Sequence, residues 1–151
     1  MFKSIFFVTM LVGLLGTGCG DLGLGNSSGS VSGSILGSDF SSIDGSAELF
    51  GGTYTITLAD TGAFACNSFE DPPLAYLTVV LAGVSSPTSI SAVSAVSFNS
   101  FEDGVNDVEG ATSGTIVIDE IDDVSGVISG TIDASGPTSF VSGSFSTEIC
   151  R

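Results

Sequence analysis

The sequence has no histidine and no tryptophan, and lysine and arginine together account for only two of its 151 residues. Without histidine, the chain lacks the most common general base, every Ser–His or Cys–His nucleophile pair, and all histidine-ligated metal sites. Paired carboxylates can cleave a glycosidic bond. Such sites need aromatic platforms for the sugar, however, and the chain has only two tyrosines beside its lack of tryptophan. We therefore expect a protein that is not an enzyme.

The scarcity of basic residues leaves a strongly acidic chain. Seventeen Asp and Glu residues give a formal net charge of −15 at pH 7. Nucleic-acid binding is excluded on this ground, because its affinity depends on Lys and Arg side chains that neutralise phosphates. The acidic surface would also be repelled by anionic lipid headgroups. The excess of acid can serve solubility, cation binding or repulsion.

The N-terminal segment has the composition of an export signal. Lys3 precedes an apolar run over residues 5–15, and the small residues 16–18 lead to Cys19. A charged start, an apolar stretch of about ten residues and a small-residue exit are typical of secretory signal peptides. The apolar run is shorter than the roughly 20 residues that span a bilayer as a helix. We interpret residues 1–18 as a cleaved signal peptide rather than a transmembrane anchor.

The residues before Cys19 specify the kind of signal. Residues 14–19, Leu-Leu-Gly-Thr-Gly-Cys, resemble the lipobox of bacterial lipoproteins, although the family prefers leucine where this chain has Gly16. The resemblance implies cleavage before Cys19, a diacylglycerol on its thiol and an acyl chain such as palmitate on the new amino terminus. Two or three acyl chains anchor a protein stably where one would be marginal. The lipid would thus hold the protein to a membrane.

The residues after Cys19 predict where the anchored domain lies. In Gram-negative lipoproteins an aspartate directly after the cysteine commonly retains the protein at the inner membrane. Here that position is Gly20 and the aspartate is Asp21, so the resemblance implies the outer membrane. Residues 19–30 are rich in Gly and Ser and are expected to form a lipidated tether with a reach of roughly 15–20 Å. The remaining domain is expected over residues 31–151.

The chain has three cysteines, which is an odd number for an exported protein. If Cys19 carries lipid, Cys66 and Cys150 remain as an even pair in an oxidising compartment, where disulfides persist. A bridge between them would close a loop of about 85 residues, worth on the order of 4 kcal/mol in the chain-entropy model. We predict this disulfide, with two buried free thiols as the alternative. Two thiols alone do not complete a tetrahedral metal site.

Apolar residues in the domain alternate with polar ones. Tyr54, Ile56 and Leu58 are separated by threonines, which is typical of a half-buried strand. Turn residues such as Gly51-Gly52 and Asp103-Gly104 separate the candidate strands, and no segment after Cys19 has sustained helical spacing. The pattern predicts an all-β fold, an antiparallel β-sandwich or small barrel of about eight strands. The candidates are residues 31–36, 46–50, 53–58, 74–81, 89–98, 115–118, 128–132 and 141–149.

Two acidic stretches could bind calcium. Ca²⁺ takes oxygen ligands from loop carboxylates and backbone carbonyls. Neither stretch has the EF-hand spacing, so a solvated acidic loop at a hairpin end is the favoured interpretation and Ca²⁺ is the only cofactor considered. The acidic residues are Glu102, Asp103, Asp107 and Glu109 in the first stretch, and Asp119, Glu120, Asp122 and Asp123 in the second.

Three functions remain for comparison. The first is a non-enzymatic envelope lipoprotein with a structural or adhesive role, which binds a membrane through its lipid and meets an envelope partner. The Ser- and Gly-rich composition and the C-terminal hairpin pattern are similar to those of small β-rich lipoproteins of bacterial envelopes. The second is a carrier with an apolar cavity of at least about 300 Å³. The third is a calcium-stabilised binding module. A sandwich is expected to fill its core with isoleucines and with Phe50, Phe98, Phe140 and Phe145.

Overall fold

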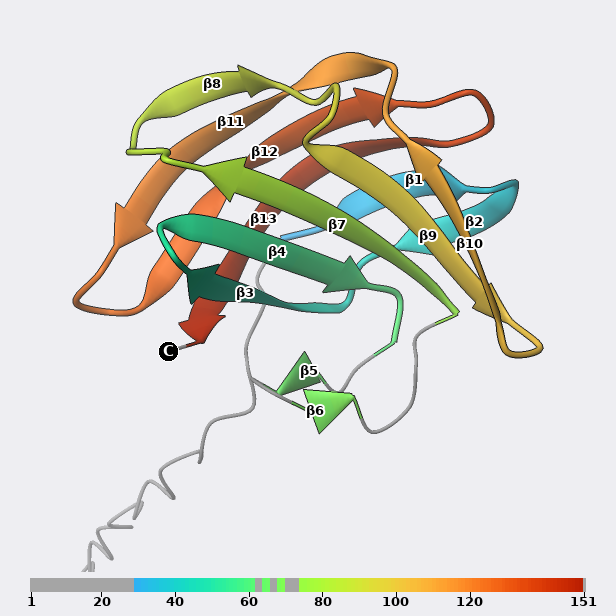
Figure 1. Cartoon of the computed structure of the whole chain (residues 1–151), viewed down its shortest axis with the longest axis horizontal. Helices are drawn as coiled ribbons and strands as arrows, with labels where there is room; N and C mark the ends of the chain where they lie inside the picture. The colour runs from blue at the N-terminus through green and yellow to red at the C-terminus, as the bar shows by residue number, and fades with distance from the viewer. Residues whose placement is uncertain (1–28, 62–63, 66–67, 70–73, 151) are drawn as a thin grey trace, which may run out of the picture.

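The computed structural model describes residues 29–61, 64–65, 68–69 and 74–150. The expected signal peptide and most of the tether lie outside these ranges, as do Cys19 and Cys66. All regular structure among the described residues is β-strand, which confirms the predicted all-β class (Figure 1).

Thirteen strands are present in the described part of the chain. They exceed the predicted number for three reasons: the candidate segment 89–98 is divided by a turn, an acidic stretch expected to be a loop forms a strand, and three short strands lie outside every candidate segment. The strands are β1 (Val31–Ile35), β2 (Ser38–Ser41), β3 (Asp44–Phe50), β4 (Thr53–Ala59), β5 (Phe64–Ala65), β6 (Ser68–Phe69), β7 (Ala75–Ala82), β8 (Thr88–Ser91), β9 (Val96–Glu102), β10 (Val105–Gly110), β11 (Ser113–Asp122), β12 (Val127–Ser135) and β13 (Phe140–Cys150).

Eleven strands form one sheet that curls back on itself. Its order is β10-β9-β7-β4-β3-β13-β12-β11-β8, with β1 attached to β13 and β2 attached to β1, while β5 and β6 pair separately. The long strand β13 joins the two halves. It pairs antiparallel with β12 and β1, and its last two residues pair in parallel with β3. The two halves, β3-β4-β7-β9-β10 and β2-β1-β13-β12-β11-β8, thus form the layers of an open sandwich (Figure 1).

Short turns with positive φ angles connect the two strands of several hairpins. Gly51 and Gly52 have φ angles of 59° and 81° and connect the paired residues Phe50 and Thr53. Asp103 and Gly104, with φ angles of 51° and 80°, connect β9 to β10 in the same way. Two consecutive residues with positive φ match the twist of antiparallel strands and favour Gly and Asp. These turns confirm the turn positions predicted from the sequence.

One hydrophobic core lies between the two layers. The predicted alternation in β4 is confirmed, because Tyr54, Ile56 and Leu58 are all buried. Phe98 from one layer and Ile118 from the other are fully buried in the same cluster. Complete burial of such a side chain contributes about 1.5–3 kcal/mol. Packing of these two faces is therefore the main stabilising interaction of the domain.

The predicted aromatic core was half wrong. Phe98 and Phe145 are buried as predicted, but Phe50 is 88% exposed and Phe140 is 57% exposed. Both exposed residues stand at strand ends, and β3 is exposed over its last three residues, which include Phe50. Because successive side chains alternate between the faces of a strand, buried Val141 places Phe140 on the outer face.

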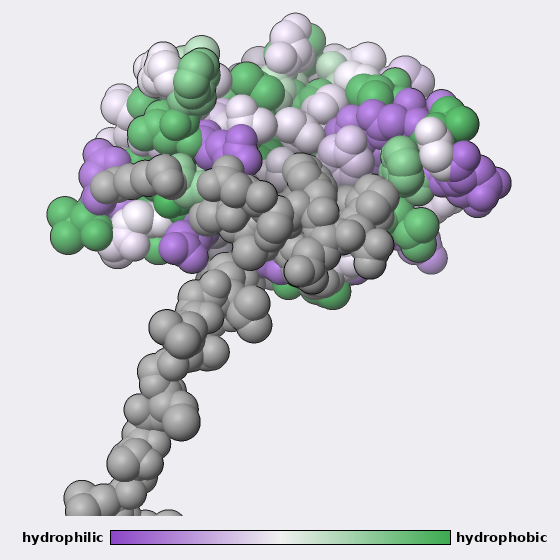
Figure 2. All heavy atoms as spheres, turned by 60° about the horizontal axis from the view of Figure 1, so that its bottom comes forward, coloured by the Kyte–Doolittle hydropathy of each residue, from purple (hydrophilic) through white to green (hydrophobic). Residues whose placement is uncertain are grey.

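Exposed hydrophobic residues are dispersed over the described surface. Ile43, Leu74 and Val124 are more than half exposed, and each lies in a different loop or turn. Figure 2 shows hydrophobic residues as separate spots among hydrophilic ones on the described part of the face turned to the viewer. Single exposed apolar residues are usual for folded domains.

Candidate functional site

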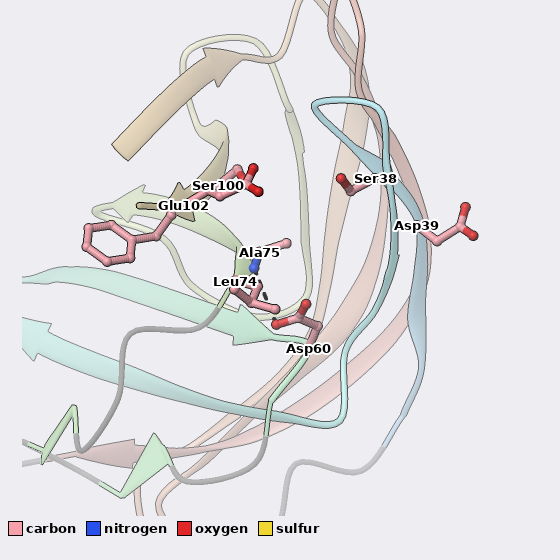
Figure 3. Close-up of a pocket in the computed structure, with 8 residues that line it drawn as sticks. Ser38, Asp39, Asp60, Leu74, Ala75, Ser100 and Glu102 are labelled. Carbon is pink, nitrogen blue, oxygen red and sulfur yellow. Dashed lines mark hydrogen bonds between the residues drawn. The ribbon is translucent and has the colours of Figure 1, made fainter. Parts of the chain in front are cut away.

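A pocket lies between the two layers at the end where β4 stops and β7 begins (Figure 3). Its volume is about 230 Å³. Ligand sites for small molecules usually measure at least about 300 Å³. The pocket is lined from both layers, by Ser38 and Asp39 of β2 and by Asp60, Leu74, Ala75, Ser100, Phe101 and Glu102 of the opposite layer.

The pocket offers mainly hydrogen-bond acceptors. One oxygen of the Asp60 carboxylate accepts a hydrogen bond from the Ala75 amide at 3.3 Å. Glu102 comes from the opposite wall to Ser38, whereas the Asp39 carboxylate points away from the pocket (Figure 3). Leu74, which is 65% exposed, adds an apolar rim. Carboxylates and hydroxyls beside an apolar rim suit a basic group with an aliphatic stem rather than an anion.

The sequence analysis identified Glu102 but not the other acidic residues that line this pocket. Asp39 lies on β2 and Asp60 directly follows β4, so both are distant from Glu102 along the chain. No local spacing relates residues from three separate elements. Only the pairing of β4 with β7, and of β7 with β9, brings Asp60 and Glu102 to the same end of one layer.

The first predicted acidic stretch forms a hairpin instead of a loop. Glu102 ends β9, Asp103 occupies the turn, and Asp107 and Glu109 lie on β10. The registers Val105↔Glu102 and Asp107↔Ser100 show that Glu102 and Asp107 project from the same face of the hairpin as Ser100.

Glu109 has a structural role that the sequence did not indicate. Its carboxylate accepts hydrogen bonds from the Thr138 amide at 3.0 and 3.1 Å, from the Thr138 hydroxyl at 2.6 Å and from the Ser139 amide at 3.0 Å. Burial alone would raise the pKa of Glu109, but these hydrogen bonds outweigh it and hold the pKa below its ordinary value of 4.5. Ser139 in turn accepts a hydrogen bond from the Leu36 amide at 2.9 Å. Glu109 therefore links β10 to the β12–β13 turn and, through it, to the β1–β2 turn.

The second predicted acidic stretch covers the end of β11 and the turn to β12. Asp122 accepts hydrogen bonds from the amides of Val124 at 2.8 Å and Ser125 at 3.1 Å. Hydrogen bonds to the carboxylate lower the pKa of Asp122. The hydrogen bond from the Ser125 side chain contributes most, followed by those from the two amides. Asp119 falls where the β11–β12 register shifts between Ile118 and Glu120. Asp122 thus stabilises its own turn.

The two acidic hairpins do not form a common site. The β9–β10 turn and the β11–β12 turn lie on opposite sides of the molecule (Figure 1). Within the described residues, no group of three Asp, Glu, Cys or His side chains is arranged to hold a metal ion. Glu109 and Asp122 are engaged by protein donors. Calcium binding by either stretch stays the less favoured, untested alternative.

The predicted disulfide lies partly outside the described residues. Cys150 is 6% exposed at the end of β13 and is disulfide-bonded. It is paired in register with Glu48 of β3. Strand β5, which directly precedes Cys66, also contacts β3. The predicted partner Cys66 and the predicted lipidation site Cys19 are not among the described residues, so the Cys66–Cys150 pairing stays a prediction.

Searches for related proteins add no assignment. Across the described ranges, no helix has the length and hydropathy needed to cross a membrane. No protein-family model matches the chain, and no curated protein or solved structure shows significant similarity to it.

Proposed function

We propose that this protein is a lipid-anchored component of the bacterial cell envelope with a non-enzymatic, structural or adhesive binding role. The observation that carries the proposal is the sequence of residues 14–19, which ends in Cys19 at the exit of an export signal. The Gly- and Ser-rich residues 19–30 then separate the lipid from the first strand, which begins at Val31. This spacing would let the domain stand clear of the headgroups.

The character of the domain supports binding rather than catalysis. The chain has no histidine, and its single lysine stands in the segment that signal cleavage would remove. The dispersed apolar surface also suits the proposed lipid anchor, because the protein would then attach to the membrane through the lipid and not through an apolar protein face.

The carrier alternative receives less support. The core of the domain is filled by large side chains such as Ile56, Leu77 and Phe98, which are all fully buried in one cluster. The pocket at the end of the sandwich, at about 230 Å³, is smaller than usual ligand sites, and five of its eight lining residues are polar. A lipid carrier would need an apolar cavity between the layers.

Metabolic labelling with a palmitate analogue tests the anchor. We expect label on the wild-type protein, no label on a Cys19→Ser variant, and full label on a Cys66→Ser variant, which serves as the matched control. Fractionation of the two membranes should place the labelled protein in the outer membrane. A Cys19→Ser protein that still incorporates the label would contradict the proposal.

A further inference from the structure

Strand β10 forms an edge of the sheet, and its outer side pairs with no other described residue. It pairs with β9 on one side and stands at the end of the strand order among the described residues. Five of its six residues are exposed, and Val105 and Val108 are each 59% exposed. An unpaired edge presents backbone N–H donors and C=O acceptors that can pair with another extended segment.

The two faces of the β9–β10 hairpin differ in chemistry. Register places Glu102, Val105 and Asp107 on the face that includes the pocket residue Ser100. The opposite face carries Asn106 and the exposed Val108. A strand added to β10 would continue both faces, since its side chains also alternate. Its residues beside Asp107 would meet carboxylates, and the intervening residues would lie beside Val108.

The charge of the edge selects the sign of its partner. Asp103 in the turn and Asp107 on β10 are exposed, and the whole chain has a formal net charge of −15. Pairing with a second copy of this chain would place like charges opposite one another, which destabilises a strand pair. A basic segment would gain from the same carboxylates. Charged edges normally protect a sheet against self-association. Here the carboxylates repel acidic segments but do not repel basic ones.

We propose that the β10 edge is the docking site for an extended segment of a partner protein in which lysine or arginine alternates with apolar residues. The segment adds to β10 as a strand. Its basic side chains lie beside Asp107, with Glu102 one strand further away on the same face, and its apolar side chains cover Val108. This inference rests on the proposed function, because the partner segment must be present outside the cytoplasm, where the anchored domain would lie.

Peptide binding to the full mature protein in detergent micelles tests the docking site. The first probe is a peptide of alternating Lys and Val, about ten residues long, which is the length of a long strand. A Glu–Val peptide tests charge. A Lys–Val peptide with proline at several valine positions tests backbone pairing, because proline has no N–H to donate. Calorimetry gives the affinities, and hydrogen exchange reports protection of the β10 amides.

We expect the Lys–Val peptide to bind and to protect the β10 amides, and neither of the other peptides to do so. Asp107→Asn should weaken binding about two- to fivefold, as is typical of exposed ion pairs. Its matched control is Asp133→Asn, which removes another exposed aspartate, from β12 in the other layer, and should leave the affinity unchanged. Higher salt should weaken binding to the wild type.

Three results would overturn the docking site: no binding of the Lys–Val peptide, equal binding of the proline-containing peptide, or an equal loss of affinity in Asp107→Asn and Asp133→Asn. The anchor fails independently of this test. If Cys19 is labelled but the protein does not bind the peptide, only the docking proposal is refuted. If the protein binds the peptide but is not labelled, only the proposed lipid anchor is refuted.

Discussion

Replacement of Gly130 by alanine is expected to destabilise the domain, because no space exists for a side chain at this position. Gly130 is buried in the middle of β12, between Ile118 of β11 and Phe145 of β13. A Cβ atom built on Gly130 would lie 2.1 Å from the carbonyl oxygen of Val117 and 3.2 Å from the Cα atom of Ile118. Even close C···O contacts between strands measure about 3.3 Å. The added methyl group would thus overlap a backbone atom by about 1 Å.

The size of the effect follows from what must move. The obstructing atom belongs to the backbone of β11, so rotation of a side chain cannot relieve the overlap. Separation of β11 from β12 would strain ladder hydrogen bonds on both sides of Gly130. Overpacking of this kind costs about 1–3 kcal/mol. Because the overlap is with a backbone atom, we expect the cost to lie in the upper half of this range, about 2–3 kcal/mol. The lower entropy of alanine in the unfolded chain offsets about 0.4–1 kcal/mol. The net loss is then about 1–2.5 kcal/mol, or roughly 4–12 °C in Tm.

Urea and thermal unfolding of the mature protein measure this loss, and Gly110→Ala provides the matched control. Gly110 is exposed at the end of β10, and a Cβ atom there would have no neighbour within 4 Å. Its replacement should change the stability by less than about 0.5 kcal/mol. The reasoning is refuted if Gly130→Ala is as stable as the wild type, or if both substitutions destabilise the protein equally.

Four further outcomes are expected. Glu109→Gln should destabilise the protein at pH 7. The difference in the free energy of unfolding from the wild type should vanish as the pH falls through the lowered pKa of Glu109, because a depressed pKa contributes stability only while the carboxylate is charged. A constant difference from pH 7 to pH 3 in urea unfolding would contradict this. Phe98→Ala, at a fully buried position, should cost about 3–5 kcal/mol in the same assay, and a loss below 1 kcal/mol would contradict a packed core. Cys66→Ser and Cys150→Ser should each lower the stability by about 2–4 kcal/mol, and non-reducing mass spectrometry of the wild type should find the two cysteines in one linked peptide. Millimolar Ca²⁺ should leave Tm unchanged, since a native-state ligand would raise it.

The sequence by itself determined the fold class, and it shows which common catalytic side chains the chain lacks. Alternation in residues 53–58 predicts β4, because a half-buried strand needs a period of two regardless of its neighbours. The turns at Gly51-Gly52 and Asp103-Gly104 are local as well, since positive φ angles are restricted to few residue types. The absence of histidine and the net charge are properties of composition. None of these features depends on distant contacts.

Tertiary structure alone decided which polar and aromatic residues come together. Asp60 and Glu102 line one pocket because β4, β7 and β9 pair in sequence across the sheet. Glu109 stabilises a turn that lies about thirty residues further along the chain. Alternation within β13 already separates Phe140 from Phe145, but the pairing of β13 with β12, β1 and β3 decides that the face with Phe145 is the inner one. Such outcomes depend on long-range register, and a local pattern of residues contains no information about the strand that will lie beside it.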